Sequence, residues 1–176
     1  MSGPDARFDW FADTMGVRAG ERVLELGPGS GASLQRIAAR LGDGRIVGVD
    51  RSATAIARAG LRCATEIADG RVRLVEGEIG NTEAARLLDE LDSGTRFDLI
   101  FAVNVNLFWT GPATAAWSTV RECLAPTGRF WLCYGYGTPG PMPPTDKLTE
   151  RFAAAGFRCT VTTANNLLAA RATPIR

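Results

Sequence analysis

The sequence contains no histidine, a single lysine (Lys147) and no pair of cysteines spaced for metal binding. Without histidine, the most common general base and the most common zinc ligand are both missing. The four cysteines, Cys63, Cys123, Cys133 and Cys159, lie far apart along the chain. We therefore expect no metal site and interpret the cysteines as reduced core side chains of a cytoplasmic protein.

The sequence also lacks an excess of charge of either sign. Twenty basic and 19 acidic residues leave a formal net charge of +1. Because such a chain has no basic field to attract phosphates or anionic headgroups, we expect neither a nucleic acid nor a membrane as partner. No apolar run reaches the roughly 18 residues of a membrane-spanning helix. The first residues also lack the basic-then-apolar pattern of a signal peptide.

What the sequence does contain is a regular alternation of short apolar runs and helical periods, within a length of 176 residues that suits one domain. The apolar runs are rich in branched and aromatic residues and are bounded by Gly, Asp or Pro, which is typical of buried strands. The strands predicted in this way are Arg22–Leu26, Arg45–Asp50, Val72–Gly77, Phe97–Val103 and Gly128–Tyr134.

Helices are predicted between these strands. Apolar residues at positions i, i+3, i+4 and i+7 indicate helices over Leu34–Leu41 and Ala84–Leu91, and a similar stripe covers Trp117–Leu124. We expect further helices over Ala53–Glu66 and Thr145–Ala155, and a terminal hairpin around Asn165–Asn166. The alternation predicts an α/β fold with a doubly wound, mostly parallel seven-stranded sheet, a C-terminal antiparallel hairpin and helices on both faces.

The first predicted strand leads into three glycines, Gly27, Gly29 and Gly31, and Glu25 stands two residues before the first of them. Glycines allow the backbone to approach a ligand closely, and ligands of such sheets bind beyond the carboxyl ends of the strands. A tight turn without a ligand is the less attractive interpretation, since three glycines cost much backbone entropy. Asp50 follows about 20 positions later, where a ribose-binding acid belongs.

The glycine spacing leaves two classes of cofactor open. Gly27, Gly29 and Ala32 also satisfy the permissive dinucleotide fingerprint G-x-G-x-x-G/A. The charge of Glu25 decides between them, because a carboxylate repels a pyrophosphate and attracts an ammonium or sulfonium group. This interpretation favours S-adenosylmethionine, which carries both cations and no phosphate.

Five motifs then stand in order between Val23 and about Gly135. They are "ELGPGSG" from Glu25, Asp50 at the end of the second strand, Glu78 after the third (where Asp is more usual), "FDLIFAV" from Phe97, and "LAPTG" from Leu124. Together they resemble the class I S-adenosylmethionine-dependent methyltransferases. The resemblance implies that S-adenosylmethionine is the cofactor.

The resemblance also implies roles for matching residues. The glycine loop with Gly27, Pro28, Gly29 and Gly31 would hold the cofactor, and Glu25 would orient this loop and the cofactor's ammonium group. Asp50 would accept hydrogen bonds from both ribose hydroxyls; the alternative is a cap of the next helix.

The adenine would lie near the end of the third strand. Gly77, Glu78 and Ile79 would surround it, with Glu78 and the Ile79 backbone at its amino edge. For Glu78 the alternative is a solvated loop acid. Arg51 would stack on the ring or point to water, and we expect the latter.

Methyl transfer to an acceptor is an in-line displacement that needs mainly positioning of the nucleophile. Asn104, which follows the fourth strand, would contact the cofactor and orient the acceptor beside it, and Trp109 would wall the pocket. The alternatives are a turn cap for Asn104 and a core position for Trp109. In a rival mechanism, a general base takes a proton from the acceptor, and Tyr134 with a depressed pKa would be that base. The sequence "NVNL" lacks the prolines of the amino-methyltransferase motif, which argues against that subclass.

We expect a single domain over residues 1–176. Residues 1–20 would form an N-terminal helix or lid, 21–135 the cofactor-binding core, and 136–176 a helix and hairpin on the substrate side. The aromatic segment Phe8–Phe11 is either a lid over the cofactor or, as we prefer, part of a helix packed on the sheet edge.

The expected function is methyl transfer to an O, N or C atom of a small-molecule acceptor, and a homodimer is left open. One alternative is a catalytically silent S-adenosylmethionine-binding or interaction module. A weaker alternative is a nicotinamide-dependent reductase, for which no Tyr-x-x-x-Lys pair is present.

Overall fold

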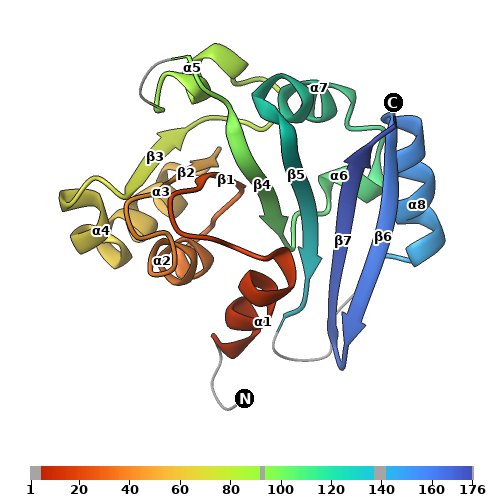
Figure 1. Cartoon of the computed structure of the whole chain (residues 1–176), viewed down its shortest axis with the longest axis horizontal. Coiled ribbons are helices and arrows are strands. Elements are labelled where there is room, and N and C mark those ends of the chain that lie inside the picture. Colours follow the sequence, from red (N-terminus) through yellow and green to blue (C-terminus); the bar gives the residue numbers. More distant parts are fainter. Residues whose placement is uncertain (1–4, 92–93, 137–141, 176) are drawn as a thin grey trace.

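The computed structural model describes residues 5–91, 94–136 and 142–175. Helices and strands alternate along most of the chain (Figure 1). In chain order they are α1 (Ala6–Met15), β1 (Arg22–Leu26), α2 (Ala32–Ala38), β2 (Arg45–Asp50), α3 (Ala53–Arg62), α4 (Ala64–Ala68), β3 (Val72–Glu76), α5 (Ala84–Leu88), β4 (Phe97–Val103), α6 (Leu107–Thr110), α7 (Thr114–Cys123), β5 (Leu124–Tyr134), α8 (Thr145–Ala154), β6 (Phe157–Ala164) and β7 (Leu167–Pro174).

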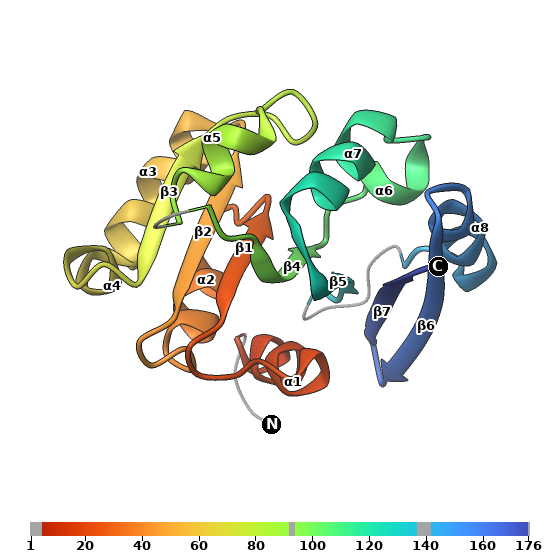
Figure 2. The same ribbon diagram turned by 45° about the horizontal axis from the view of Figure 1, so that its top comes forward.

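The strands form one seven-stranded sheet in the order β3-β2-β1-β4-β5-β7-β6. Strands β1 to β5 run parallel, whereas β7 pairs antiparallel with both β5 and β6. The hairpin β6–β7 and helix α8 lie at one end of the molecule, and α3 and α4 lie at the other (Figure 2). The predicted fold class is thereby confirmed.

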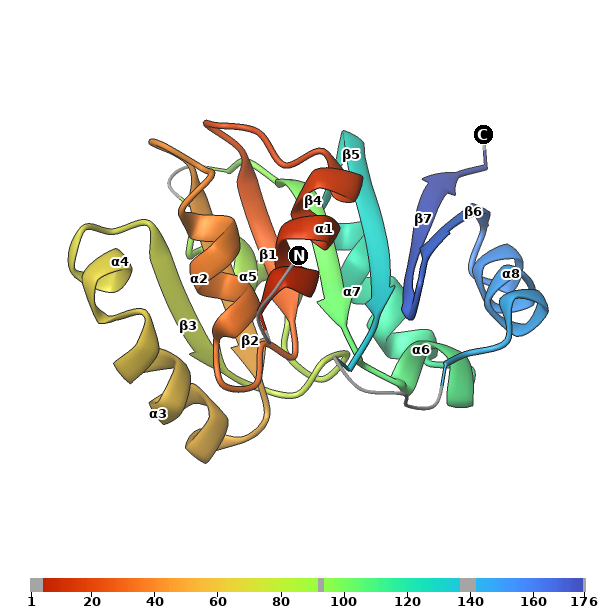
Figure 3. The ribbon, with the colours of Figure 1, turned by 90° about the horizontal axis from the view of Figure 1, so that it is seen from below.

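Side chains of the central strands alternate between two hydrophobic cores, one on each face of the sheet. On β4, Ile100 and Ala102 pack in the core beneath α5, α7 and α8, while Leu99 and Phe101 pack in the core beneath α1, α2 and α3. Figure 3 looks onto the face covered by α1 and α2. Burial on both faces explains why these strands read as continuous apolar runs.

Helix α1 lies on a face of the sheet and not at its edge. Phe8, Phe11 and Met15 are buried in the same core as Leu99 of β4 and Trp131 of β5. The segment Phe8–Phe11 was interpreted either as a lid or as part of a helix packed on the sheet edge. The structure shows a packed helix, which covers a face of the sheet and not its edge. The functional division of the chain at residues 20 and 135 stays a prediction.

Several local expectations differ from the structure. Helix α2 ends at Ala38, three residues before the predicted Leu41. The helix expected over Ala53–Glu66 is interrupted at Cys63, which separates α3 from α4. Helix α5 ends at Leu88, three residues before the predicted end, and α6 was not predicted. Strand β5 begins at Leu124, before the expected Gly128.

The cysteines form no disulfide; Cys63, Cys123 and Cys133 are buried, and Cys159 is half-buried. Among the helices of the described chain, none has the length and apolar character needed to cross a membrane.

Candidate cofactor site

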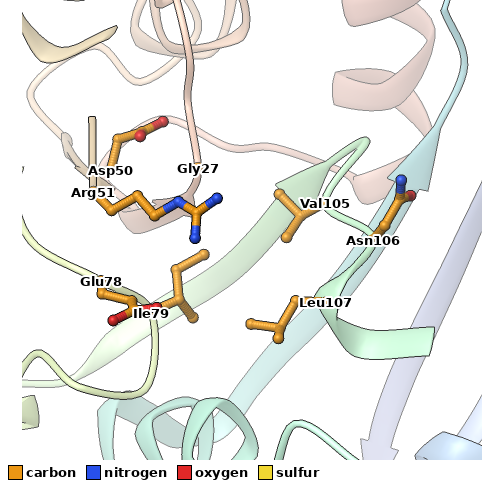
Figure 4. A pocket seen from close by; sticks show the side chains of 8 residues that line it. All are labelled: Gly27, Asp50, Arg51, Glu78, Ile79, Val105, Asn106 and Leu107. Carbon is orange, nitrogen blue, oxygen red and sulfur yellow. The ribbon is translucent and has the colours of Figure 1, made fainter. Parts of the chain in front are cut away.

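A cavity of about 460 Å³ opens at the carboxyl ends of the parallel strands. Figure 4 shows its lining, which comes from the segments that follow β1, β2, β3 and β4. The lining residues are Gly27, Asp50, Arg51, Glu78, Ile79, Val105, Asn106 and Leu107. The cavity therefore lies where doubly wound sheets bind ligands.

The glycine loop at the cavity has a backbone that other residues rarely adopt. Gly27, Gly29 and Gly31 have φ angles of 73°, 56° and 81°. A Cβ on Gly31 would lie 2.9 Å from the Cβ of Ala59 in α3, and a Cβ on Gly27 would lie 2.9 Å from Val105 Cγ2. Glycine is thus required both by conformation and by the close approach of neighbouring elements.

Asp50 ties this loop to the beginning of α3. Its Oδ2 accepts a hydrogen bond from Gly29 N–H at 3.0 Å, and its Oδ1 accepts one from Ser52 N–H at 2.9 Å. Ser52 is the N-cap of α3, where its hydroxyl accepts from Ala55 N–H at 3.2 Å. Ser52 therefore caps the helix, while Asp50 braces the glycine loop and lines the cavity.

Glu25 is fully buried behind the loop and is not part of the cavity lining. One carboxyl oxygen accepts a hydrogen bond from the Ser33 hydroxyl of α2, and the other is buried without a hydrogen-bond partner. Burial raises the pKa of Glu25 to about 8; the Ser33 hydroxyl opposes this rise and the nearby Asp50 adds to it. Burial therefore favours the protonated form of this carboxyl group.

The electrostatic argument drawn from the sequence placed the Glu25 carboxylate beside the ligand, whereas the structure buries this side chain behind the glycine loop. The charge of the cavity supports the same choice of cofactor by another route. Its lining carries two carboxylates, Asp50 and Glu78, against one guanidinium, Arg51. A net negative lining disfavours a pyrophosphate and favours a cationic ligand.

At the end of β3, the exposed Glu78 accepts a hydrogen bond from Asn81 Nδ2 at 2.6 Å and lines the cavity together with Ile79. Gly77 lies behind them, where a Cβ would clash with Thr82 Oγ1 at 2.2 Å. Arg51 was expected to point to water. It is exposed, but its guanidinium extends across the cavity toward Ile79 (Figure 4).

Asn104 was predicted to orient the acceptor, but the structure shows its amide engaged with the protein. Its Nδ2 donates to Gly135 O at 3.0 Å, and its Oδ1 accepts from Gly135 N–H at 2.8 Å. The residue adopts a left-handed φ of 57° and does not line the cavity. It links the end of β4 to the end of β5.

The rival mechanism needs a depressed pKa at Tyr134, and the surroundings of this side chain act in the opposite direction. The side chain is fully buried, and its hydroxyl donates to Val105 O at 2.9 Å. Burial raises the pKa of this phenol well above its usual value. Trp109 is half-buried, and its indole N–H donates to Asn106 Oδ1 at 3.1 Å, so it braces a residue of the lining.

Five of the residues predicted to bind the cofactor line the cavity, and the others lie outside its lining. Gly27, Asp50, Arg51, Glu78 and Ile79 line it, whereas Glu25, Pro28, Gly29, Gly31, Gly77 and Asn104 do not. Val105, Asn106 and Leu107 were missed as lining residues. Their place directly after a predicted strand was the only signal available.

Comparison with known protein families gives one decisive match. A methyltransferase domain family model matches residues 24–130, more than half of the chain. The chain belongs to this methyltransferase family. A comparison of this chain with curated proteins finds no match.

Solved structures of the same fold include several methyltransferases. An S-adenosylmethionine-dependent methyltransferase from Aquifex aeolicus is 14% identical, with a TM-score of 0.72, over 94% of this chain and 88% of that one. The glycopeptide N-methyltransferase MtfA, in complex with sinefungin, is 16% identical, with a TM-score of 0.74, over 98% and 94% of the two chains. These likenesses confirm the class I methyltransferase fold.

The same fold is found in a protein with another reaction in its name. The [4+2]-cyclase SpnF is 14% identical, with a TM-score of 0.73, over 98% of this chain and 81% of that one. The fold by itself therefore does not fix the reaction of this methyltransferase.

The predicted cofactor, S-adenosylmethionine, agrees with the family and with the residues of the cavity. Asp50 and Glu78 offer carboxylate oxygens to hydroxyl and amino donors, and Ile79, Val105 and Leu107 offer apolar surface to a ring. The volume is in the range of small-molecule sites. The buried Oε2 of Glu25, behind the glycine loop, has no hydrogen-bond partner among the described residues.

Proposed function

We propose that this protein transfers the methyl group of S-adenosylmethionine to an O, N or C atom of a small-molecule acceptor, chiefly by positioning. The observation that carries the proposal is the cavity at the end of β1, in which Asp50 is held in place by Gly29 N–H. When bound, the cofactor supplies a methyl group on a sulfonium leaving group.

In this proposal each lining residue has a binding role. Asp50 accepts hydrogen bonds from the ribose hydroxyls with the oxygen lone pairs that Gly29 and Ser52 leave free. Glu78 accepts from the adenine amino group, and Ile79 and Leu107 cover the ring faces. The backbone of Gly27 approaches the remainder of the cofactor, because no side chain stands in the way.

The proposed mechanism needs no general base from the protein. The sequence offers no histidine, and the Tyr134 hydroxyl is buried and donates to Val105 O. A residue that holds its proton this firmly is a poor acceptor of another group's proton. The pH dependence of the rate should therefore follow the pKa of the acceptor's own nucleophile.

Two measurements in sequence test the proposal. Calorimetry with S-adenosylmethionine, S-adenosylhomocysteine and NAD should show heat of binding for the first two only. A panel of small molecules with methyl-labelled S-adenosylmethionine should then give acceptor-dependent formation of S-adenosylhomocysteine. Tight binding of NAD with no S-adenosylmethionine heat would replace the proposal with the reductase alternative.

A second candidate function is cofactor binding without methyl transfer. The likeness to SpnF supports this candidate, because that protein has the same fold and is named for a cyclase reaction and not for methyl transfer. The labelled-cofactor panel separates the candidates. A silent module binds S-adenosylmethionine in the calorimeter and forms no S-adenosylhomocysteine with any acceptor.

A further inference from the structure

A second cavity, of about 390 Å³, lies next to the end of β5. Three parts of the chain form its walls. They are Tyr136, which follows Gly135 after the end of β5, the segment that leads into α8, and the turn between β6 and β7. Met142, Pro143 and Leu168 give it apolar surface, and Pro143 and Leu168 are buried. The mechanism proposed above gives this cavity no role.

The two cavities flank a single structural link. Asn104 at the end of β4 is hydrogen-bonded through its amide to Gly135 at the end of β5. Val105, the neighbour of Asn104, lines the cofactor cavity, and Tyr136, the neighbour of Gly135, lines the second cavity. The two cavities are therefore connected, through this pair of residues, at the carboxyl ends of β4 and β5.

The wall formed by the β6–β7 turn is held tightly at this position. Tyr134 of β5 pairs with Leu168 of β7 in the antiparallel register. A Cβ on Gly135 would lie 2.4 Å from Leu167 Cδ2 and 3.3 Å from Asn166 O, so the turn packs directly on the glycine. The β6–β7 wall of the second cavity is thus packed against the end of β5.

The linings of the two cavities differ in charge. The cofactor cavity contains Asp50, Arg51 and Glu78, whereas none of the described residues that line the second cavity is charged. Asp146 and Lys147 follow the lining residue Thr145 in α8 but are not part of the lining. An ionised group placed in this cavity would gain no partner of opposite charge from the described lining residues.

The second cavity does offer neutral hydrogen-bonding groups. The hydroxyls of Tyr136 and Thr163 and the amide of Asn166 belong to lining residues, and within the described chain their side chains have no hydrogen-bond partner. Hydroxyls and amides both donate and accept, so they suit alcohols, phenols, carbonyls and amides.

We propose that the second cavity binds the body of the methyl acceptor and selects an uncharged molecule with an apolar ring system and neutral polar substituents. This inference rests on the proposed function. It narrows the acceptor from any small molecule to one that carries no phosphate, carboxylate or ammonium group on the part held in this cavity.

The test uses methionine methyl groups as reporters, because Met142 lines the cavity and Met15 is buried in the opposite core. Protein labelled with [methyl-¹³C]methionine and saturated with S-adenosylhomocysteine is titrated with two pairs of probes. Each pair shares a ring and differs in charge: 2-naphthol with 6-hydroxynaphthalene-2-sulfonate, and indole with tryptamine. The Met142 signal is assigned with Met142→Leu.

The neutral probe of each pair should shift the Met142 signal and leave Met15 unchanged, and the charged probe should bind at least tenfold more weakly. Thr163→Glu, which adds a carboxylate to the lining, should raise the affinity ratio of tryptamine to indole about fivefold. Thr162→Glu is the matched control, since Thr162 is also exposed and is not part of the lining. This control should leave the ratio unchanged.

Equal affinities within each pair, or no Met142 shift by either neutral probe, would overturn the inference. Calorimetry on the same samples keeps the two proposals apart. Binding of S-adenosylhomocysteine without a response of Met142 contradicts only the acceptor cavity, whereas failure to bind S-adenosylhomocysteine contradicts the proposed function.

Discussion

At the scale of single residues, Asn104 lies next to the cofactor cavity but does not line it, and its amide is bonded to the protein. The sequence places Asn104 correctly at the end of β4, and a left-handed φ is one that asparagine tolerates better than most residues. Its partner Gly135 is 31 residues further along the chain. No local pattern reveals such a bond, so the sequence could locate the residue but not say what its amide contacts.

Replacement of Asn104 by alanine should therefore destabilise the protein. Two hydrogen bonds to Gly135 are lost, at about 1 kcal/mol each, and alanine at a positive φ adds about 1 kcal/mol. Urea denaturation should show a loss of roughly 2–3 kcal/mol in the free energy of unfolding. Unchanged stability together with a reduced kcat/KM would instead restore the role predicted from the sequence.

Asp50 belongs to the residues whose motif does predict the position of the side chain. Asp50→Ala should weaken S-adenosylmethionine binding by about 2–4 kcal/mol, at about 1–2 kcal/mol for each charge-assisted hydrogen bond. Asp50→Asn keeps one acceptor oxygen and should lose less. Calorimetry on both variants, with the exposed Asp43→Asn as control, measures this. A dissociation constant unchanged by Asp50→Ala would contradict the ribose contact and leave Asp50 only the role of holding the glycine loop.

The buried Glu25 should make stability depend on pH. Burial raises its pKa from 4.5 to about 8 in the folded chain. Between these values the folded chain holds the proton and the unfolded chain releases it, so stability falls as pH rises from about 4.5 to 8 and is independent of this group outside that window.

Glu25→Gln should remove this pH dependence, since an amide does not titrate. The difference in unfolding free energy between wild type and Glu25→Gln should change by roughly 1 kcal/mol per pH unit inside the window. Urea denaturation of both proteins in a series of buffers measures it. Parallel profiles for the two proteins would show that Glu25 is already ionised in the folded chain.

At the scale of elements, the central strands were predictable because their environment is uniform. Strands β1, β2 and β4 have the predicted bounds, since burial on both faces makes each one a continuous apolar run that ends at Gly, Asp or Asn. Helix α6 has four residues, too few to show a helical period. The interruption at Cys63 carries no glycine or proline that would have signalled it.

Helix α1 should contribute to the core and not act as a mobile lid. Phe11 is 1% exposed and packs among Phe8, Met15 and strands of the sheet. Phe11→Ala should lower the free energy of unfolding by about 3–5 kcal/mol. Trp10→Ala on the same helix is the control; because Trp10 is only half-buried, it should cost less than half as much. Equal, small losses for both variants would indicate a loosely attached lid.

At the scale of the whole molecule, several arginines form ion pairs with nearby carboxylates. Arg22 pairs with Asp98 at 2.7 Å, and Arg129 pairs with Glu21 at 2.7 Å. Each of these pairs is bidentate, with two hydrogen bonds between the guanidinium and the carboxylate. They neutralise the positive charge locally, and the sequence already showed this balance in its net charge of +1.

Nucleic acid should therefore bind weakly to this protein. Affinity for a phosphate backbone comes from releasing counterions with a cluster of Lys and Arg, and a chain with 20 basic and 19 acidic residues has no excess of positive charge for such contacts. Fluorescence anisotropy with a labelled RNA hairpin and a DNA duplex in 150 mM salt should give dissociation constants weaker than about 10 µM. Repeating the titration at several salt concentrations should give a shallow slope. A sub-micromolar complex with a steep slope would mean that the folded surface gathers arginines from distant parts of the chain into a phosphate-binding patch.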